Sequence, residues 1–384
     1  MVFAFSFSTI IKILLFLLIL CATISIHELG HLLFAKKYNV YCYEYSIGFG
    51  KAIYTNKKGE THFCIRLIPL GGFVRMAGEE GIEEGEELLD NNEQPIPKER
   101  IFGNAKKRHK VLILAAGGLF NMALAFVCFF IYLVGHGVPN YNQPYVQLVE
   151  NGEIAKQTDM PSQAYITKLS ITLDGNDIVV DEEIKDFDDI SAAINKATPT
   201  AEGQTRVITF TYKKSENSKI EKTAVVTMTS LAKEHEDGTT SYYYGKIGFS
   251  LTMYKYNFFE AIPQTFVFMG KYFVEICKAF GQLFTGNLSN LSGLVGIYEA
   301  VDQASSVGVT PLIYIAGAIS FSLGFFNLMP FPALDGGRIV FVLYEGVTGK
   351  KVSPKIEGII HTVGIILLFG LMIIINVRDI IKLF

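Results

Sequence analysis

Residues 24–31, ISIHELGH, lie within an otherwise apolar run near the start of the chain. On an α-helix, His27 and His31 project from the same face one turn apart, close enough to share one metal ion. Glu28 lies beside them, where its carboxylate can act on a metal-activated water without being a ligand. This H-E-x-x-H spacing is typical of zinc metalloproteases.

The apolar setting of this motif is unusual for a soluble enzyme. Between residues 11 and 35 the only other ionisable side chains are Lys12 and Cys21. Ionisable groups are costly inside a membrane and mark functional sites there by default. Two histidines that merely pack within a soluble helix are the alternative, and the apolar surroundings argue against it. We therefore expect a metal site within the bilayer.

Composition also indicates a membrane protein. Half of the residues are hydrophobic and 18% are charged, and the mean hydropathy is +0.31. A transmembrane helix needs about 20 mostly apolar residues, and four stretches come close to this length: 10–34, 111–134, 312–328 and 356–376. Cleavage of the first stretch as a signal peptide would discard the histidines, so we expect it to be retained. The formal net charge of -3 predicts no nucleic-acid partner.

Basic residues at the ends of these stretches predict the orientation. They follow the first stretch at Lys36 and Lys37, precede the second within 105–110, and separate the third from the fourth within 349–355. Such clusters mark the cytoplasmic side of a membrane. Four spans then leave both termini and the long segment 136–256 on the opposite side.

The loop after the first span contains two distinct pieces. Residues 62–76, HFCIRLIPLGGFVRM, are typical of two short strands around a Pro/Gly turn. This apolar hairpin either enters the membrane, where protein covers its backbone, or lies on the surface, and the sequence leaves both open. The acidic run at 79–93 predicts a solvated linker.

The outer segment is predicted to be a small α/β domain. A helix is expected at 186–197, with Asp186 as its N-cap, and strands at 147–154, 206–212 and 223–228. Such a domain suits a module that binds a peptide by strand addition, and a structural plug over the site is the alternative.

A third zinc ligand is expected far downstream, because a catalytic zinc site takes three protein ligands and keeps one position open. Residues 326–338, FNLMPFPALDGGR, place Asp335 in an apolar helix that Pro330 and Pro332 interrupt. An unpaired aspartate is costly in a membrane, and metal coordination removes that cost. The alternative is an ion pair between Asp335 and Arg338.

Asp335 and His31 are more than three hundred residues apart, so this site requires the third span to pack against the first. Small residues would permit that close approach. They are Gly317, Ala318 and Gly324 on the third span, and Ala22 and Gly30 on the first. The less constrained alternatives to Asp335 are Glu275 and Glu299.

Five motifs together resemble those of bacterial site-2 proteases, a family of intramembrane zinc proteases that cleave anti-sigma factors in regulated proteolysis. They are HELGH at 27–31, PLGGFVRM at 69–76, AAGGLFNMALA at 115–125, LSGLVGI at 291–297 and NLMPFPALDGGR at 327–338. The chain departs from the family at Leu294 and Gly118, where proline is frequent, and around residues 162–171 of the outer domain.

The resemblance implies a role for each motif. His27, His31 and Asp335 would bind Zn2+, and Glu28 would be the general base. The residues that would hold the substrate in an extended form are Asn327, Pro330 and Pro332, together with Gly72 and Phe73 of a membrane-re-entrant β-loop. The outer segment would be a single PDZ-like domain.

We therefore expect a polytopic α-helical membrane protein with about four transmembrane helices and one extracytoplasmic PDZ-like α/β domain. The expected parts are the first transmembrane helix with the metal motif (1–37), a cytoplasmic loop with a re-entrant β-hairpin (38–110), the second transmembrane helix (111–135), the PDZ-like domain (136–256), an amphipathic membrane-surface segment (257–310), and the broken third and the fourth transmembrane helices (311–384). The protein would lie in the bacterial inner membrane, with the catalytic site opening toward the cytoplasm.

The expected activity is zinc-dependent hydrolysis of peptide bonds within transmembrane segments. Its partners would be the lipid bilayer and single-span membrane proteins, such as anti-sigma-factor-like proteins or signal-peptide remnants; the sequence does not predict an oligomeric state. Two other classes of protein are alternatives. A membrane metal transporter could also place such ligands in its spans, and an inactive scaffold could bind peptides through the outer domain. Neither requires Glu28 beside the first ligand.

Overall fold

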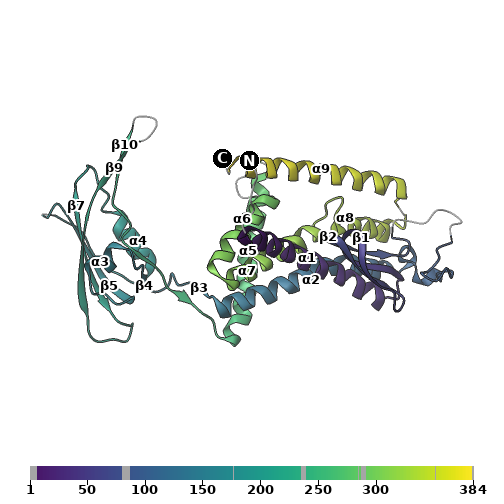
Figure 1. Ribbon diagram of the computed structural model, residues 1–384, viewed down its shortest axis with the longest axis horizontal. Helices are drawn as coiled ribbons and strands as arrows, with labels where there is room; N and C mark the ends of the chain where they lie inside the picture. The colour runs from purple at the N-terminus through teal and green to yellow at the C-terminus, as the bar shows by residue number, and fades with distance from the viewer. Residues whose placement is uncertain are drawn as a thin grey trace. The chain divides into compact units, whose positions relative to one another are not determined.

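The computed structural model describes residues 7–79, 87–175, 177–234, 239–283, 285–286, 291–350 and 352–382. The chain forms two compact units, which Figure 1 shows in ribbon form. The helical unit comprises Met1–Gly135 and Asn257–Phe384, and the sheet unit comprises His136–Tyr256. The sheet unit has the same bounds as the predicted outer domain. Half of the predicted acidic linker, residues 80–86, lies outside the described residues.

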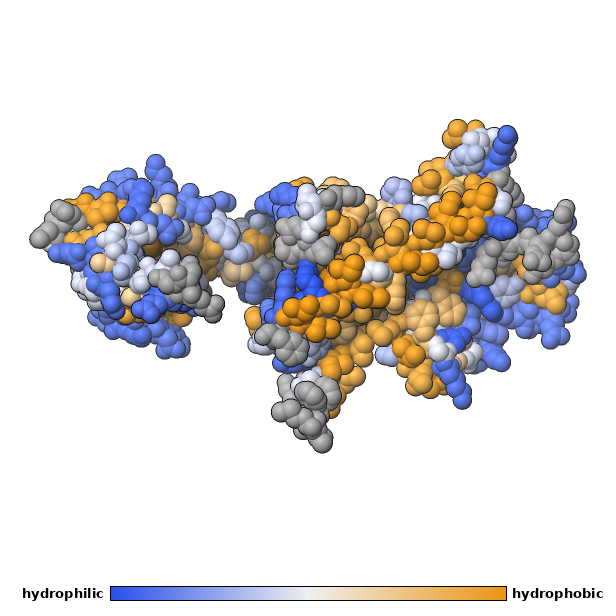
Figure 2. Space-filling view, turned by 90° about the horizontal axis from the view of Figure 1, so that it is seen from above, coloured by the Kyte–Doolittle hydropathy of each residue, from blue (hydrophilic) through white to orange (hydrophobic). Residues whose placement is uncertain are grey.

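Four helices of the helical unit are long and apolar enough to cross a membrane. They are α1 (Phe7–Lys37), α2 (Lys107–Gly135), α7 (Val309–Leu328) and α9 (Pro354–Ile381). Each contains one of the four predicted apolar stretches. Large apolar side chains such as Leu18 on α1 and Ile366 on α9 are about two-thirds exposed (64% and 65%). Figure 2 shows a broad hydrophobic surface over this unit and a mostly hydrophilic surface over the sheet unit, as expected for a multi-pass membrane protein.

Three further helices complete the helical unit. They are α5 (Phe258–Leu283), α6 (Leu294–Val307) and α8 (Asp335–Thr348). Helix α7 ends at Leu328 and α8 begins at Asp335, so the third apolar stretch is interrupted where two prolines were predicted to break it. Proline donates no backbone hydrogen bond, which explains the position of the break.

Helix α2 lies between α1 and α7, and small residues make this packing close. A Cβ atom on Gly30 of α1 would lie 2.5 Å from the carbonyl oxygen of Ala116 on α2. A Cβ atom on Gly324 of α7 would lie 2.7 Å from the carbonyl oxygen of Gly118, also on α2. Gly30 and Gly324 therefore pack against α2 and not against each other. The predicted direct use of these residues between the first and third spans is wrong, because both helices use the glycine-rich face of α2.

The loop between α1 and α2 forms two long strands. Strands β1 (Cys42–Asn56) and β2 (His62–Met76) pair antiparallel. The predicted hairpin within 62–76 is wrong in its pairing: residues 62–65 and 72–75 both pair with residues 44–47 of β1, not with each other. Gly71, at φ +102°, lies between the two halves, where such a backbone is unfavourable for other residues. Two short 3-10 turns, Lys98–Arg100 and Phe102–Asn104, precede α2.

The sheet unit is built on one six-stranded sheet with the order β11-β4-β5-β7-β8, in which β6 pairs with β5. Its strands are β4 (Tyr145–Leu148), β5 (Gln163–Leu173), β6 (Asp177–Glu183), β7 (Thr205–Lys213), β8 (Lys222–Thr229) and β11 (Phe249–Leu251). Two small two-stranded sheets pair β3 (Val138–Pro139) with β12 (Met253–Tyr254), and β9 (Leu231–Glu234) with β10 (Thr240–Tyr243). The helices are α3 (Glu153–Gln157) and α4 (Phe187–Asn195).

The predicted elements of the sheet unit are largely confirmed. The side chain of Asp186 accepts a hydrogen bond from the backbone N–H of Asp189 at 2.9 Å and caps α4, as expected. Strands β7 and β8 contain the two predicted stretches. The strand predicted at 147–154 is wrong in extent, because β4 ends at Leu148 and Gly152 caps the short helix α3.

Alternating side chains of β7 and β8 contribute to the core of this unit. Ile208 and Phe210 on β7 are buried, and Val226 on β8, which pairs with Ile208, is buried with them. The next residue, Val225, points to the opposite face and is 49% exposed. The alternation fixes which face of each strand enters the core.

This alternation predicts unequal effects of two neighbouring substitutions. Val226→Ala should lower the free energy of unfolding of the sheet unit by about 2 kcal/mol, because it removes buried methyl groups and leaves a cavity. Val225→Ala should change it by less than about 0.5 kcal/mol. Hydrogen exchange of β7 and β8 peptides in the full chain measures both values. Equal losses in the two variants would contradict the assigned faces.

Candidate metal centre

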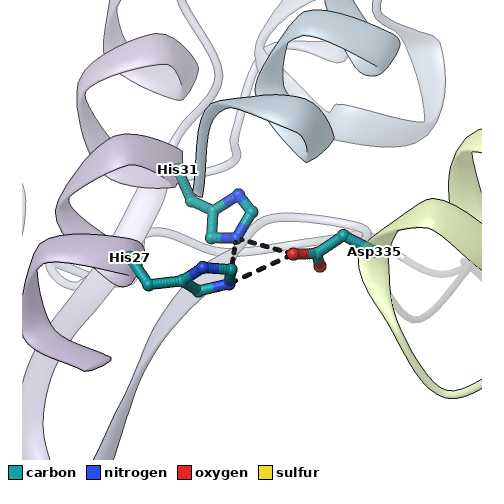
Figure 3. Close-up of side chains that lie close together, drawn as sticks. All are labelled: His27, His31 and Asp335. Carbon is teal, nitrogen blue, oxygen red and sulfur yellow. Dashed lines mark hydrogen bonds and ion pairs between the residues drawn. The ribbon is translucent and has the colours of Figure 1, made fainter. Parts of the chain in front are cut away.

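Helix α1 holds His27 and His31 on one face, one turn apart. Both residues are buried, each with 6% of its surface exposed. Their Nε2 atoms lie 3.1 Å apart, and Figure 3 shows the two rings turned toward each other and toward Asp335. The two rings therefore direct the same type of nitrogen into one small space, which is the arrangement that the motif spacing predicts.

Asp335 reaches this space from the other end of the chain, at the first position of α8. Its Oδ2 atom lies 3.1 Å from Nε2 of His27 and 3.3 Å from Nε2 of His31. The ligand atoms of the three side chains all lie within 4.8 Å of one another. In the part of the chain that the structure describes, no other three His, Cys, Asp or Glu residues form such a group.

The chemistry of this group fits zinc. Two imidazole nitrogens and one carboxylate oxygen are a ligand set of catalytic zinc sites, which keep a fourth position open. Oδ2 of Asp335 is buried and, among the described residues, accepts no hydrogen bond, so a cation there would satisfy it. Gly117 of α2 leaves the space free: a Cβ atom there would overlap Nε2 of His31 and lie 2.7 Å from Cε1 of His27.

Helix α2 also orients the two imidazoles through their other nitrogens. His31 donates from Nδ1 to the carbonyl oxygen of Ile113 at 2.8 Å, which leaves Nε2 free to bind a metal. Nδ1 of His27 lies 3.4 Å from the side-chain amide of Asn121. The atom that makes this contact is Nδ2, whereas Oδ1 of Asn121 has no hydrogen-bond partner in the described chain. Turned toward the ring, this oxygen can accept the hydrogen of His27 Nδ1.

Asn121 is a residue of this site whose role was not predicted from the sequence. It is fully buried in α2, and its backbone carbonyl accepts a hydrogen bond from the hydroxyl of Ser320 on α7 at 2.8 Å. An amide inside an apolar span was the available signal, because polar residues at that depth have partners or functions. Its partner could not be identified without the packing of α1 on α2.

Glu28 lies beside the group without joining it. Its Oε2 atom accepts a hydrogen bond from the backbone N–H of Val74 in β2 at 3.1 Å. Gly72 of the same strand is also close, since a Cβ atom there would lie 3.6 Å from Cγ of Glu28. Strand β2 therefore lies next to the carboxylate. Phe73 stacks on Phe49, with ring centroids 6.2 Å apart.

The other residues assigned to substrate binding lie around the interrupted helix. Asn327 donates from Nδ2 to the carbonyl oxygen of Leu323 in its own helix at 2.9 Å. It lines a cavity of about 520 Å³, together with Leu334, next in sequence to Asp335. Pro332 packs against Gly364 of α9. Pro330 lies in the same connection between α7 and α8.

Arg338, the alternative partner of Asp335, and Glu275, one alternative to Asp335 as the third ligand, are both engaged elsewhere. Arg338 forms an ion pair with Glu79, which follows β2, and does not pair with Asp335. Glu275 forms an ion pair with Lys278 of its own helix at 2.8 Å. The ion pair between Asp335 and Arg338 is therefore wrong as an explanation of the buried carboxylate.

Comparison with known proteins agrees with this geometry. The sequence profile of Peptidase family M50 matches residues 15–371. The chain is 29% identical to the zinc metalloprotease RasP of Shouchella clausii and to the regulator of sigma-W protease RasP of Bacillus subtilis, in each case over 97% of this chain and 99% of the relative. It is also 29% identical to a putative zinc metalloprotease of Staphylococcus aureus (strain COL), over 98% of this chain and all of the relative. The chain belongs to peptidase family M50 and is a zinc metalloprotease of the site-2 type.

Proposed function

We propose that this protein hydrolyses peptide bonds within the transmembrane segments of single-span membrane proteins. The observation that carries the proposal is the meeting of His27, His31 and Asp335 within an apolar helical unit. The Bacillus subtilis relative is named a regulator of sigma-W protease, which supports a role in regulated proteolysis. The substrates would be anti-sigma-factor-like proteins or signal-peptide remnants.

In this proposal His27, His31 and Asp335 hold the zinc ion, which supplies Lewis-acid chemistry that activates water and polarises a carbonyl group. Asn121 and the carbonyl oxygen of Ile113 orient the two imidazoles from behind. Their partners on α2 prevent the rings from turning, so Nε2 remains directed at the site.

Glu28 is the proposed general base. The N–H of Val74 holds its Oε2 atom at 3.1 Å, so Oε1 remains available for the proton of the attacking water. The carboxylate then delivers this proton to the nitrogen of the leaving amine. Because Val74 fixes the carboxylate at one side, Glu28 stays beside the three ligands and does not compete with them.

The substrate helix must unwind before it can be cut, because its carbonyl groups are engaged in its own hydrogen bonds. Freed backbone groups are costly in a membrane unless they find partners. We propose that β2, around Gly72 and Phe73, pairs with the extended substrate. Asn327, Pro330 and Pro332 would contact it from the opposite side.

For the sheet unit we propose the PDZ-like role and an extracytoplasmic position. A cavity of about 690 Å³ lies between α4 and residues 242–249, beside the edge strand β11. An edge strand next to a helix is an arrangement to which an extended peptide can add as a further strand. Residues 38–110 and the loop before α9 would face the cytoplasm, toward which the catalytic site would open.

The first prediction of this proposal concerns the base. Glu28→Gln should reduce cleavage of a single-span substrate by at least about 100-fold, because general base catalysis contributes about 100- to 10,000-fold. The zinc content should stay close to that of the wild type, since the three ligands are unchanged. Cleavage assays and metal analysis of the same purified protein test both statements. Wild-type cleavage by Glu28→Gln would show that another group takes the proton.

The second prediction concerns the third ligand. Asp335→Asn keeps the size of the side chain but removes its charge, so both zinc content and proteolysis should fall sharply while membrane insertion is retained. Asp335→Ala should lose at least as much. Zinc content per folded protein is the measurement, and Glu275→Gln is the matched control, because Glu275 pairs with Lys278 away from the site. Full zinc occupancy in Asp335→Asn would remove Asp335 from the site.

The third prediction concerns orientation in the membrane. In a background without the five native cysteines, single cysteines at the exposed positions Lys58 and Lys219 should react with an impermeant thiol reagent from opposite sides of the membrane. Position 219 should react in intact cells, and position 58 only after permeabilisation. Reaction of both positions in intact cells would reject the proposed topology.

A further inference from the structure

The connection that places Asp335 has an unfavourable backbone. Between the end of α7 and the start of α8, Pro330 and Pro332 have no N–H group to donate, and Ala333 has φ +75°. Residues other than glycine rarely adopt this left-handed conformation, and they hold it only where the surroundings determine it. Ala333 lies two residues before Asp335, so whatever holds Ala333 also helps to set the position of the Asp335 carboxylate.

Helix α9 supplies the contact that holds Ala333. Nδ1 of His361 accepts a hydrogen bond from the backbone N–H of Ala333 at 2.9 Å. The opposite side of the ring faces Glu357, whose Oε1 atom lies 3.9 Å from Nε2. The ring also packs edge-on against Phe341 of α8, with centroids 5.7 Å apart. His361 therefore touches both the connection and the helix that begins with Asp335.

A glycine on the same face of α9 completes this contact. Gly364 lies three residues after His361, and a Cβ atom on it would lie 2.6 Å from Cβ of Pro332 and 2.7 Å from its carbonyl group. Two other glycines of α9 differ, since a Cβ atom on Gly358 or Gly370 would meet nothing within 4 Å. The backbone of α9 thus approaches the connection closely at one position, next to the histidine.

We propose that His361 and Gly364 are positioning residues for the metal centre. His361 holds the backbone N–H of Ala333, Gly364 admits Pro332 to the surface of α9, and together they fix the Asp335 carboxylate opposite His27 and His31. The proposal rests on the proposed role of Asp335 as a zinc ligand. It requires no contact between α9 and the metal.

The hydrogen bond from the N–H of Ala333 to Nδ1 of His361 can be tested with two substitutions of His361 that differ in size and in the acceptor they offer. His361→Phe keeps an aromatic ring but removes the acceptor, whereas His361→Asn is smaller but offers Oδ1 near the place of Nδ1. We expect His361→Phe to weaken zinc affinity by about tenfold or more, since loss of a residue that orients a ligand costs about 10- to 100-fold. We expect His361→Asn to stay within about threefold of the wild type.

The readouts are zinc affinity by chelator competition and the visible absorption spectrum of the Co2+-substituted protein in detergent. The spectrum reports ligand geometry and should change in His361→Phe but not in His361→Asn. A merely structural role for the imidazole would make the two variants equal or order them by size. Either that result, or wild-type zinc affinity in His361→Phe, would overturn the proposal.

The close approach of α9 to Pro332 can be tested with a second matched pair of variants. Gly364→Ala should displace Pro332 and weaken zinc affinity by about tenfold, whereas Gly370→Ala, in the same helix, should leave it unchanged. Equal affinities in these two variants would overturn the role of Gly364, and they would do so even if the histidine variants fail to fold.

Asp335→Asn, measured in parallel, separates the ligand role of Asp335 from the positioning role of His361 and Gly364. If it lowers zinc affinity while His361→Phe and Gly364→Ala do not, Asp335 remains a ligand and only the positioning role is wrong. If Asp335→Asn binds zinc normally, the proposed ligand set fails and the positioning role fails with it.

Discussion

The buried carboxylate of Asp335 is the constraint on which the helical unit depends. Its Oδ2 atom has two histidine nitrogens within 3.3 Å and, among the described residues, no hydrogen bond. An unpaired charge of this kind would be strongly unfavourable in an apolar environment. A cation held between α1 and α8, as we propose, would remove this cost. In this proposal the zinc ion joins two sequence segments that are about three hundred residues apart.

Helix α2 makes this meeting possible because two successive glycines contribute no side chain where α1 and α7 come closest to it. Gly117 and Gly118 let α1 and α7 approach its backbone, and a Cβ atom on Gly117 would occupy the space of the imidazoles. Without a strong hydrophobic drive between helices in lipid, such close backbone contact is a main source of helix association. The same helix supplies the carbonyl oxygen of Ile113 and the amide of Asn121 to the two rings. The packing of the helices and the orientation of the two histidines thus both depend on α2.

The sequence predicts the parts of the site that depend on local spacing. His27, Glu28 and His31 follow from a four-residue interval, and Asp335 follows from a carboxylate in an apolar, proline-broken stretch. Asn121 and His361 could not be assigned, because their roles depend on which helices pack together. The pairing of β2 was predicted wrongly for a related reason: the pattern of residues 62–76 indicates two extended halves, but not that both pair with residues 44–47 of β1. Long-range pairing has no signal in local periodicity.

The position of Glu28 bears on the choice between a protease and a metal transporter. Transport requires a site that releases its ion to either side, and a free carboxylate beside the ligands would join the coordination. Here Val74 of β2 engages the carboxylate of Glu28, and Gly72 of the same strand brings the backbone next to it. The strand proposed to receive the substrate is thus the one that holds the carboxylate of the proposed base. Such a coupling of a substrate-binding strand to a proton acceptor would serve hydrolysis, and it would have no use in moving an ion.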